Sequence, residues 1–174
     1  MMELTWFKNG LLFGIVSLLI TIITVYFFPI NFMILSVLLI AIYIYFIIHP
    51  AREERAKQGG YLSYVNTLMV TSSTLLFATL LSTIFGLVMN AVSPDFGERV
   101  IQNSIDGTVK MLEMFGMPAD KMEEQVDLMR SQMEGMFTPT QQILSFFKSA
   151  LVIIIICSIF SIFLKKDKEE EKYL

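Results

Sequence analysis

The chain has 174 residues, of which 55% are hydrophobic and only 17% are charged. Soluble domains usually contain about 25% charged residues, so this composition excludes an ordinary soluble globular protein. The formal net charge is −3, and the charges are segregated along the chain, which leaves long apolar blocks between them.

Four apolar blocks lie at about residues 9–28, 31–48, 61–92 and 142–164. Each comes near the ~20 apolar residues that a membrane-spanning helix needs. The sequence therefore predicts an all-α integral membrane protein with four transmembrane helices. We expect one membrane domain over residues 1–174, with a helical insertion at 93–138 and a charged cytoplasmic tail at 165–174.

The first span carries small residues on one helical face. Gly10, Gly14 and Ser17 follow a spacing of four and three, which places them together on a helix. A pair of small residues four apart lets two helix backbones approach closely. This pattern predicts a packing seam, although small residues are also common in membrane helices generally.

The second span differs from the first because it is almost wholly large and apolar between residues 32 and 48. A continuous helix over both blocks would be ~60 Å long, twice the hydrocarbon thickness, so the chain must turn near Pro29 and Asn31. We expect the second span to face lipid and residues 49–60 to form a short polar loop. His49 is expected to be interfacial, because His49 with Glu53 or Glu54 makes only a weak metal-binding pattern.

The third span, about 61–90, is the stretch around which the others are arranged. It runs for about thirty residues without a charge, and its small residues repeat every three or four positions. They are Thr67, Thr71, Thr74, Ala78, Ser82 and Gly86. We expect this seam to receive the first and fourth spans. The alternative is that its hydroxyls line a path for a neutral solute, but such hydroxyls more often bond their own backbone or another helix.

Residues 93–138 are predicted to form an extracytoplasmic hairpin of two amphipathic helices. Ser93 and Pro94 are expected to begin the first helix, residues 116–118 to break it, and the second to run from about 119 to 135. Their apolar faces consist of Ile101, Ile105 and Leu112 in the first helix and Met122, Val126, Met129 and Met133 in the second. We expect these faces to dock on each other, on the ends of the bundle or on a partner.

The fourth span opens with helix-start signals and carries a smaller seam. Thr138 is expected to cap the helix, with Pro139 in its first turn and Gln141 completing a capping box. The seam residues are Ser149, Cys157 and Ser161. Cys157 is the single cysteine, so no intrachain disulfide is possible. The acidic tail that follows is predicted to be disordered.

Basic residues determine the predicted orientation. With four spans, Lys8, the bases of residues 49–60 and those of the tail fall on one side, which the positive-inside rule assigns to the cytoplasm. Both termini are therefore expected to be cytoplasmic. Residues 93–138 hold nine acidic and four basic residues, a net charge of −5, which disfavours binding to an anionic lipid surface.

The sequence resembles a family of small bacterial inner-membrane proteins, domain of unknown function 4199, which is common in Bacteroidetes. The likeness lies in the layout of nearly the whole chain and in short matches at residues 60–64, 94–96 and 163–166, together with the methionine- and glutamate-rich helix before Thr138. The resemblance implies a multi-pass protein of the bacterial inner membrane, with a four-helix domain, an outer helical insertion and no assigned activity.

Catalytic and ion-transport patterns are lacking in the sequence. We expect no ionisable residue inside a span, which argues against an ion-coupled transporter. There is no G-x-S-x-G or H-E-x-x-H motif, so no enzyme is expected, and no cofactor or nucleic-acid partner either. The leading hypothesis is a non-enzymatic protein that acts by helix association in the lipid bilayer, as an accessory or scaffold subunit or as a homo-oligomer.

Two other functions stay open at this point. One is a small channel or transporter for a neutral solute. The other is copper binding by the outer methionines, because thioethers are soft ligands for Cu(I). Methionine also fills adaptable helical faces, and the four-three spacing of these residues favours that interpretation.

Overall fold

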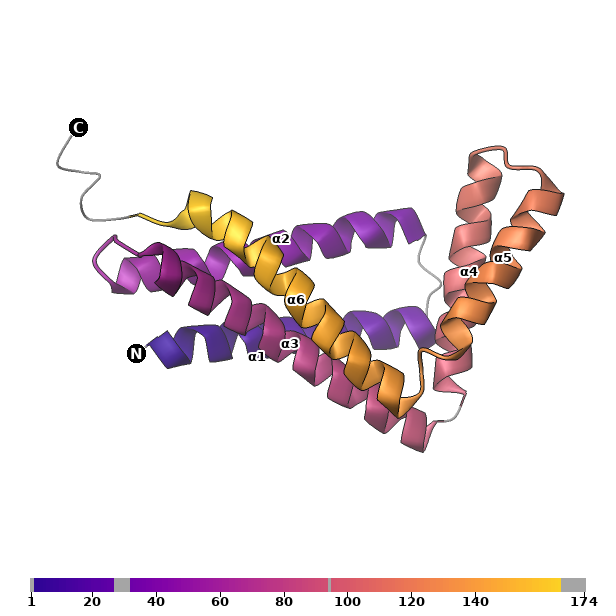
Figure 1. Ribbon diagram of the computed structural model, residues 1–174, viewed down its shortest axis with the longest axis horizontal. Helices are drawn as coiled ribbons and strands as arrows, with labels where there is room; N and C mark the ends of the chain where they lie inside the picture. Colours follow the sequence, from indigo (N-terminus) through magenta and orange to yellow (C-terminus); the bar gives the residue numbers. More distant parts are fainter. Residues whose placement is uncertain (1, 27–31, 94, 167–174) are drawn as a thin grey trace.

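The computed structural model describes residues 2–26, 32–93 and 95–166, and its regular elements in those ranges are six α-helices and one isolated β-bridge. The predicted turn at 29–31 and the tail at 167–174 lie outside the described residues. Four long helices form a bundle and two shorter ones stand across one end of it (Figure 1). The helices are α1 (Met2–Tyr26), α2 (Phe32–Lys57), α3 (Tyr64–Val92), α4 (Phe96–Met114), α5 (Ala119–Glu134) and α6 (Pro139–Leu164).

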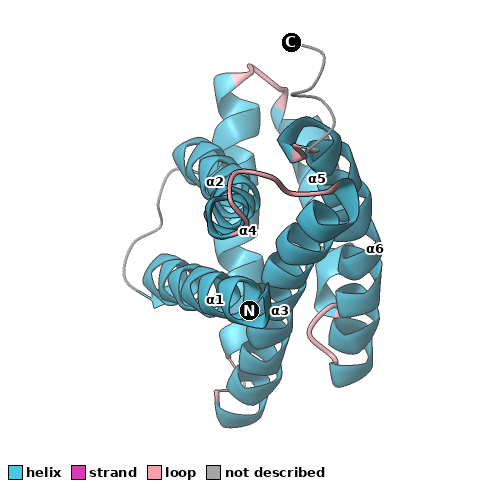
Figure 2. Cartoon of the chain, turned by 90° about the vertical axis from the view of Figure 1, so that its left-hand side faces the viewer, coloured by secondary structure: helices cyan, strands magenta, loops and turns pink. Residues whose placement is uncertain are grey.

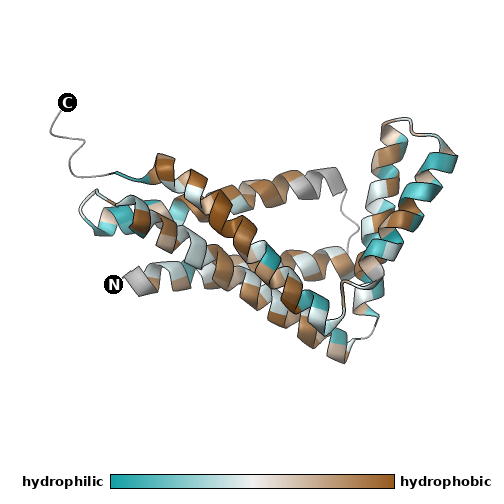
Figure 3. Cartoon of the chain, in the orientation of Figure 1, coloured by the Kyte–Doolittle hydropathy of each residue, from teal (hydrophilic) through white to brown (hydrophobic). Residues whose placement is uncertain are grey.

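Three helices are long and apolar enough to cross a membrane, over Leu4–Tyr26, Tyr64–Val92 and Pro139–Leu164. Large apolar side chains also cover much of their outward surface: Leu151 is 66% exposed and Ile155 is 61% exposed. Apolar residues dominate α6, whereas polar residues gather on α5 (Figure 3). An apolar exterior of this extent belongs to a helical membrane protein, because water would penalise it and lipid does not.

The third span is the hub of the bundle, as expected. Helix α3 contacts α1, α2 and α6, and also meets α4 near its own end. Helices α1 and α6 lie on opposite sides of α3 when the bundle is seen from its end (Figure 2). Helix α3 begins at Tyr64, three residues later than predicted, because Ser63 caps it by accepting a hydrogen bond from the backbone N–H of Asn66.

The predicted polar loop at residues 49–60 is wrong over most of its length. Helix α2 continues through Pro50 to Lys57, and the turn is confined to residues 58–63. The segment after Pro50 is rich in good helix formers, and Glu53 pairs with Lys57 one turn later. The turn contains Gly59 and Gly60, whose φ angles of 75° and 94° favour glycine.

Helices α4 and α5 lie side by side and run antiparallel (Figure 1). They are joined through Gly116, which has a φ of 70°. Helix α4 starts at Phe96 with Asp95 as its cap, and not at Ser93, because the backbone N–H of Ser93 bonds Met89 at the end of α3. Pro94 lies outside the described residues. Helix α5 covers Ala119–Glu134, as predicted.

Candidate functional site

The small-residue seam of α3 is covered by the chain's own helices. Thr67, Thr71, Thr74 and Ala78 are all buried. The three hydroxyls donate to the carbonyl oxygens four residues earlier, at 2.9, 2.9 and 2.8 Å in sequence order. Because the hydroxyls are satisfied by their own helix, their arrangement fits packing better than a path for a polar solute.

Helix α1 approaches this seam through its two glycines. A Cβ atom added at Gly10 would lie 2.9 Å from the carbonyl oxygen of Thr74, and one added at Gly14 would lie 2.7 Å from Cδ1 of Leu81. Ser17 is half-buried farther along α1. The two glycines therefore lie where the α1 and α3 backbones come closest, as a small-xxx-small pair does in membrane helices.

Helix α6 covers another part of α3. Cys157 and Ser161 are buried, and the Ser161 hydroxyl has no hydrogen-bond partner among the described residues. Ser149 is exposed, so its assignment to the seam is wrong. Three successive steps of four residues rotate by ~120° about a helix of 3.6 residues per turn, so Ser149 has turned away from Ser161 and half-buried Ala150 faces inward instead.

The far end of the α3 seam meets the start of α6. Ser82 and Gly86 are half-buried. A Cβ atom at Gly86 would lie 2.9 Å from Oε1 of Gln142, so a larger side chain would displace that amide. The Gln142 amide and the Asn90 amide both donate to the carbonyl oxygen of Phe137. These contacts hold the connection between α5 and α6 against the end of α3.

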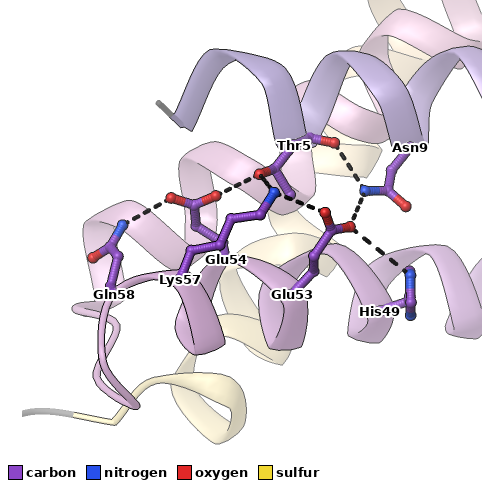
Figure 4. A network of polar contacts seen from close by, with 7 residues as sticks. All are labelled: Thr5, Asn9, His49, Glu53, Glu54, Lys57 and Gln58. Atoms are coloured by element: carbon purple, nitrogen blue, oxygen red, sulfur yellow. Dashed lines mark hydrogen bonds and ion pairs between the residues drawn. The ribbon is translucent and has the colours of Figure 1, made fainter.

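A polar cluster joins the first turns of α1 to the last turns of α2 (Figure 4). The Thr5 hydroxyl donates to Oε2 of Glu54 at 2.6 Å and accepts from Nζ of Lys57 at 2.8 Å. The Asn9 amide donates to Oε2 of Glu53 at 2.9 Å, and Lys57 also donates to Oε1 of Glu53 at 2.7 Å. The cluster ties two helices together across more than forty residues of sequence.

Burial makes Glu54 the critical member of this cluster. The residue is 2% exposed, and a buried carboxyl group is costly unless it is hydrogen-bonded. Thr5 satisfies one of its oxygens and the amide of Gln58 satisfies the other at 3.0 Å. The neighbouring Glu53 is less buried, and hydrogen bonds from Lys57 and Asn9 lower the pKa of its carboxyl group.

The cluster fits a structural clamp better than a metal site. His49 stacks on Tyr45, with ring centroids 5.0 Å apart, and its Nε2 is 3.9 Å from Glu53 Oε2. Glu54 is turned to Thr5 and away from His49 (Figure 4). The described part of the chain contains no group of three His, Cys, Asp or Glu side chains positioned to hold a metal ion.

The predicted apolar faces of α4 and α5 meet at the α4–α5 contact and at the bundle. Ile101 and Ile105 of α4 are buried. Half-buried residues line the rest of both faces, namely Leu112, Met122, Val126, Met129 and Met133. Arg130 of α5 pairs with Glu98 of α4 at 3.0 Å and also donates to Gln102. Among the described helices, α5 packs only on α4.

Helix α4 is also anchored to the end of α1. The Asn103 amide donates to the carbonyl oxygens of Thr24 and Val25, at 3.2 and 3.4 Å. Carbonyl groups in the last turn of a helix lack intrahelical partners, so Asn103 satisfies two that would otherwise need water. Arg99 adds a contact by lying over the ring of Tyr26, 5.5 Å from its centroid.

An apolar groove of about 790 Å³ opens between α2 and α6, with α3 at its base, and is here called the α2–α6 groove. Its walls include Ile44 and Ile47 of α2 and Ile156 and Phe160 of α6. Lys148 also lines it, although we expected no ionisable residue inside a span. That expectation is wrong, because Lys148 already lies within the predicted span at 142–164, and α6 covers it.

The comparisons with known proteins identify a family and assign no activity. Neither the curated proteins nor the solved structures contain a match to the chain. The model of a family described as protein of unknown function, DUF4199, matches residues 8–166. Because this match spans nearly the whole sequence, the protein belongs to the DUF4199 family.

Proposed function

We propose that this protein is a non-enzymatic, multi-pass accessory subunit that presents the α4–α5 hairpin to a membrane-protein partner. The observation that carries the proposal is the position of α5. Among the described helices it packs on α4 alone, and these helices leave its other faces uncovered. Helices α4 and α5 stand across one end of the long bundle (Figure 1), and only α4 contacts it among these two helices. A projecting hairpin held by specific contacts is suited to binding rather than to closing a core.

The charge of the hairpin favours a basic partner surface. Residues 93–138 have a net charge of −5. On α5, Asp120, Glu123, Glu124 and Asp127 are exposed. Acidic groups in this arrangement attract a basic patch and repel an anionic lipid surface, so electrostatics favours a protein over the bilayer as the ligand of the hairpin.

Four spans account best for where the ends of the helices lie. The first turn of α1, the α2–α3 turn and the last turn of α6 lie at one end of the bundle, and the hairpin lies at the other (Figure 1). We propose that α2 is the fourth span, because residues 32–48 are apolar and its 26 residues are ~39 Å long. The positive-inside rule then places both termini in the cytoplasm and the hairpin outside.

The other candidate functions have less support. Self-association through the α3 seam would compete with α1 and α6, which already cover it. A solute path along Thr67–Ser82 would need hydroxyl groups that are not already bonded to their own helix. The α5 methionines at 122, 129 and 133 are half-buried on one face, as packing residues would be.

Site-specific photo-crosslinking in intact cells tests the proposal. A photoreactive residue at Glu124 is expected to give one discrete adduct, because this exposed position faces away from α4. The same residue at Ile155, which is exposed on the apolar side of α6, is the matched control and should not give that adduct. For the charge test, the photoreactive residue is moved to Gln125. Reversing the charges of Glu123, Glu124 and Asp127 together should then abolish the hairpin adduct.

Two outcomes would contradict the proposal. One is that no adduct forms at either hairpin position. The other is an adduct that survives charge reversal unchanged, since complementarity to a basic surface would then play no part. An adduct with twice the mass of the chain would identify the membrane-protein partner as a second copy, which is the homo-oligomeric form of the same proposal.

A further inference from the structure

We propose that the α2–α6 groove binds one anionic phospholipid, with its phosphate at Lys148 and an acyl chain lying along the groove toward Phe160. This inference goes beyond the proposed function. It rests on the protein's place in a membrane and not on any partner of the hairpin, so the two can fail separately. The groove is apolar along most of its length, and one end of it carries Lys148 and Ser149.

The groove is long enough to receive an acyl chain that enters from one leaflet of a bilayer. Lys148 and Phe160 are twelve residues apart on α6, which corresponds to ~18 Å along the helix axis. One leaflet contributes ~15 Å to a hydrocarbon core of ~30 Å. An acyl chain that enters beside Lys148 can therefore follow the apolar wall toward Phe160 until it reaches the middle of the bilayer.

The depth of Lys148 suits a phosphate group. Leu164 is the last residue of α6, and Lys148 lies ~24 Å from it along the helix. If Leu164 marks one boundary of the hydrocarbon, Lys148 lies ~6 Å inside the opposite one. The four-carbon stem of lysine covers that distance by snorkelling, which brings the ammonium to the level of the headgroups.

A negative charge from outside the chain would stabilise Lys148. The ammonium reaches the level of the headgroups by snorkelling, where an anionic group can pair with it. No described acidic residue lies within ion-pair distance of Lys148, and the groove lining contains no other charged residue. An apolar groove with one cation at its headgroup end is complementary to an anionic phospholipid, whose phosphate supplies the charge and whose chain fills the groove.

Lipid titration of the full-length protein in detergent micelles, followed by native mass spectrometry, tests the inference. Phosphatidylglycerol should bind at one saturable site, about fivefold more tightly than phosphatidylcholine with the same acyl chains, since one lysine near a membrane surface contributes about that factor. Lys148→Gln should reduce phosphatidylglycerol binding to the level of phosphatidylcholine. Lys110→Gln, which changes an exposed lysine on α4, should leave the preference intact.

A second pair of variants tests the groove itself. Ile156→Trp adds volume inside the groove and should weaken the binding of both lipids. Ile155→Trp, on the neighbouring outward face, should weaken the binding of neither. Equal binding of the two lipids, or an unchanged preference in Lys148→Gln, would overturn the proposal. Displacement of the lipid by an equal concentration of inorganic phosphate would also overturn it. So would a dimer of the protein that excludes lipid from the groove and dissociates in Ile156→Trp.

Discussion

Thr5 shows how much one side chain can connect. Its hydroxyl is both a donor to Glu54 and an acceptor from Lys57, so this one small residue in the first turns of α1 bonds two side chains of α2. Polar groups at such a junction must all be satisfied, because a partly satisfied buried network is less stable than an apolar one. The stability of the α1–α2 junction should therefore depend on this hydroxyl.

Thr5→Val keeps the shape of the side chain and removes the hydroxyl. We expect it to lower the free energy of unfolding by about 1–3 kcal/mol, because the buried Glu54 carboxyl group loses a donor. Equilibrium unfolding in mixed micelles measures this. Thr83→Val is the matched control, since the Thr83 hydroxyl bonds only its own helix, and it should change stability by less than about 0.5 kcal/mol. Equal losses in both variants would contradict the role of the cluster.

Glu53 gives the same junction a dependence on pH. Hydrogen bonds from Lys57 and Asn9 lower the pKa of its carboxyl group below the usual 4.5. A lowered pKa in the folded state contributes stability that is fully present above the unfolded value and is lost as the pH falls through the folded value. The stability difference between the wild type and Glu53→Gln should therefore be constant between about pH 7 and pH 5.5 and shrink below about pH 4.5.

Equilibrium unfolding of the wild type and Glu53→Gln across this pH range tests the direction in which their stability difference changes with pH. In a Lys57→Met background the pH dependence of the difference should become smaller, because the largest cause of the lowered pKa is removed. A difference that increases on acidification would contradict the assignment.

At the scale of helices, the approach of α1 to α3 depends on two glycines with unequal surroundings. A Cβ atom at Gly10 would meet the carbonyl oxygen of Thr74, which belongs to the backbone and cannot move cheaply. A Cβ atom at Gly14 would meet the tip of the Leu81 side chain, which can change its rotamer. Gly10→Ala should therefore be the more damaging substitution, at about 1–3 kcal/mol relative to Gly14→Ala.

The comparison is well controlled because both glycines lie inside α1. Each substitution gains the same helix propensity of about 1 kcal/mol, so the difference between the two variants isolates the steric contact. Gly135→Ala, at the C-cap of α5, adds a Cβ atom into open space and shows the effect of the added methyl group without a clash and outside a helix. Equal stabilities of the Gly10 and Gly14 variants would show that α1 can shift away from α3 at little cost.

The spacing of small residues predicted the packed faces well where buried positions recur every three or four residues along one helix. It identified the seam of α3 and the glycine pair of α1. Helix-start signals, and not periodicity, identified the Thr138 cap of α6, where the Thr138 hydroxyl accepts from the backbone N–H of Gln141. Periodicity failed at Ser149, because a strict spacing of four drifts around a helix of 3.6 residues per turn. The correct face could have been found by following three- and four-residue steps together.

The polar cluster was missed for a different reason. Polar residues after an apolar run were interpreted as a loop, although the Glu53–Lys57 spacing is a local signal for a continued helix. The burial of Glu54 depends on Thr5, which lies 49 residues away in the sequence. No local pattern contains that contact, so only the packing of α1 on α2 reveals it.

At the scale of the whole molecule, polar contacts divide between its two ends. At one end, the cluster around Glu54 and the backbone bridge between Leu62 and Lys166 hold α1, α2, α3 and α6 together. At the other end, Asn103 and Asn90 attach the hairpin and its connection to α6. Apolar contacts dominate between these ends, as expected when both ends face water and the middle of the bundle faces lipid.

This division predicts which positions water-soluble reagents reach. In a Cys157→Ala background, single cysteines at Leu4, Ala56 and Ser131 report the start of α1, the end of α2 and the surface of α5, and all three positions are exposed. With four spans and a cytoplasmic N-terminus, an impermeant thiol reagent should label Ser131→Cys in intact cells. It should label Leu4→Cys and Ala56→Cys only after the membrane is opened.

The three positions distinguish three membrane spans from four, because each pair of positions is separated by a defined set of helices. Leu4 and Ala56 lie on the same side if α1 and α2 both cross the membrane, and on opposite sides if only one of them does. Ala56 and Ser131 lie on opposite sides if α3 crosses. Labelling of Leu4→Cys but not Ala56→Cys would contradict the fourth span. The fully reversed pattern would keep four spans but place the acidic hairpin in the cytoplasm, against the positive-inside rule.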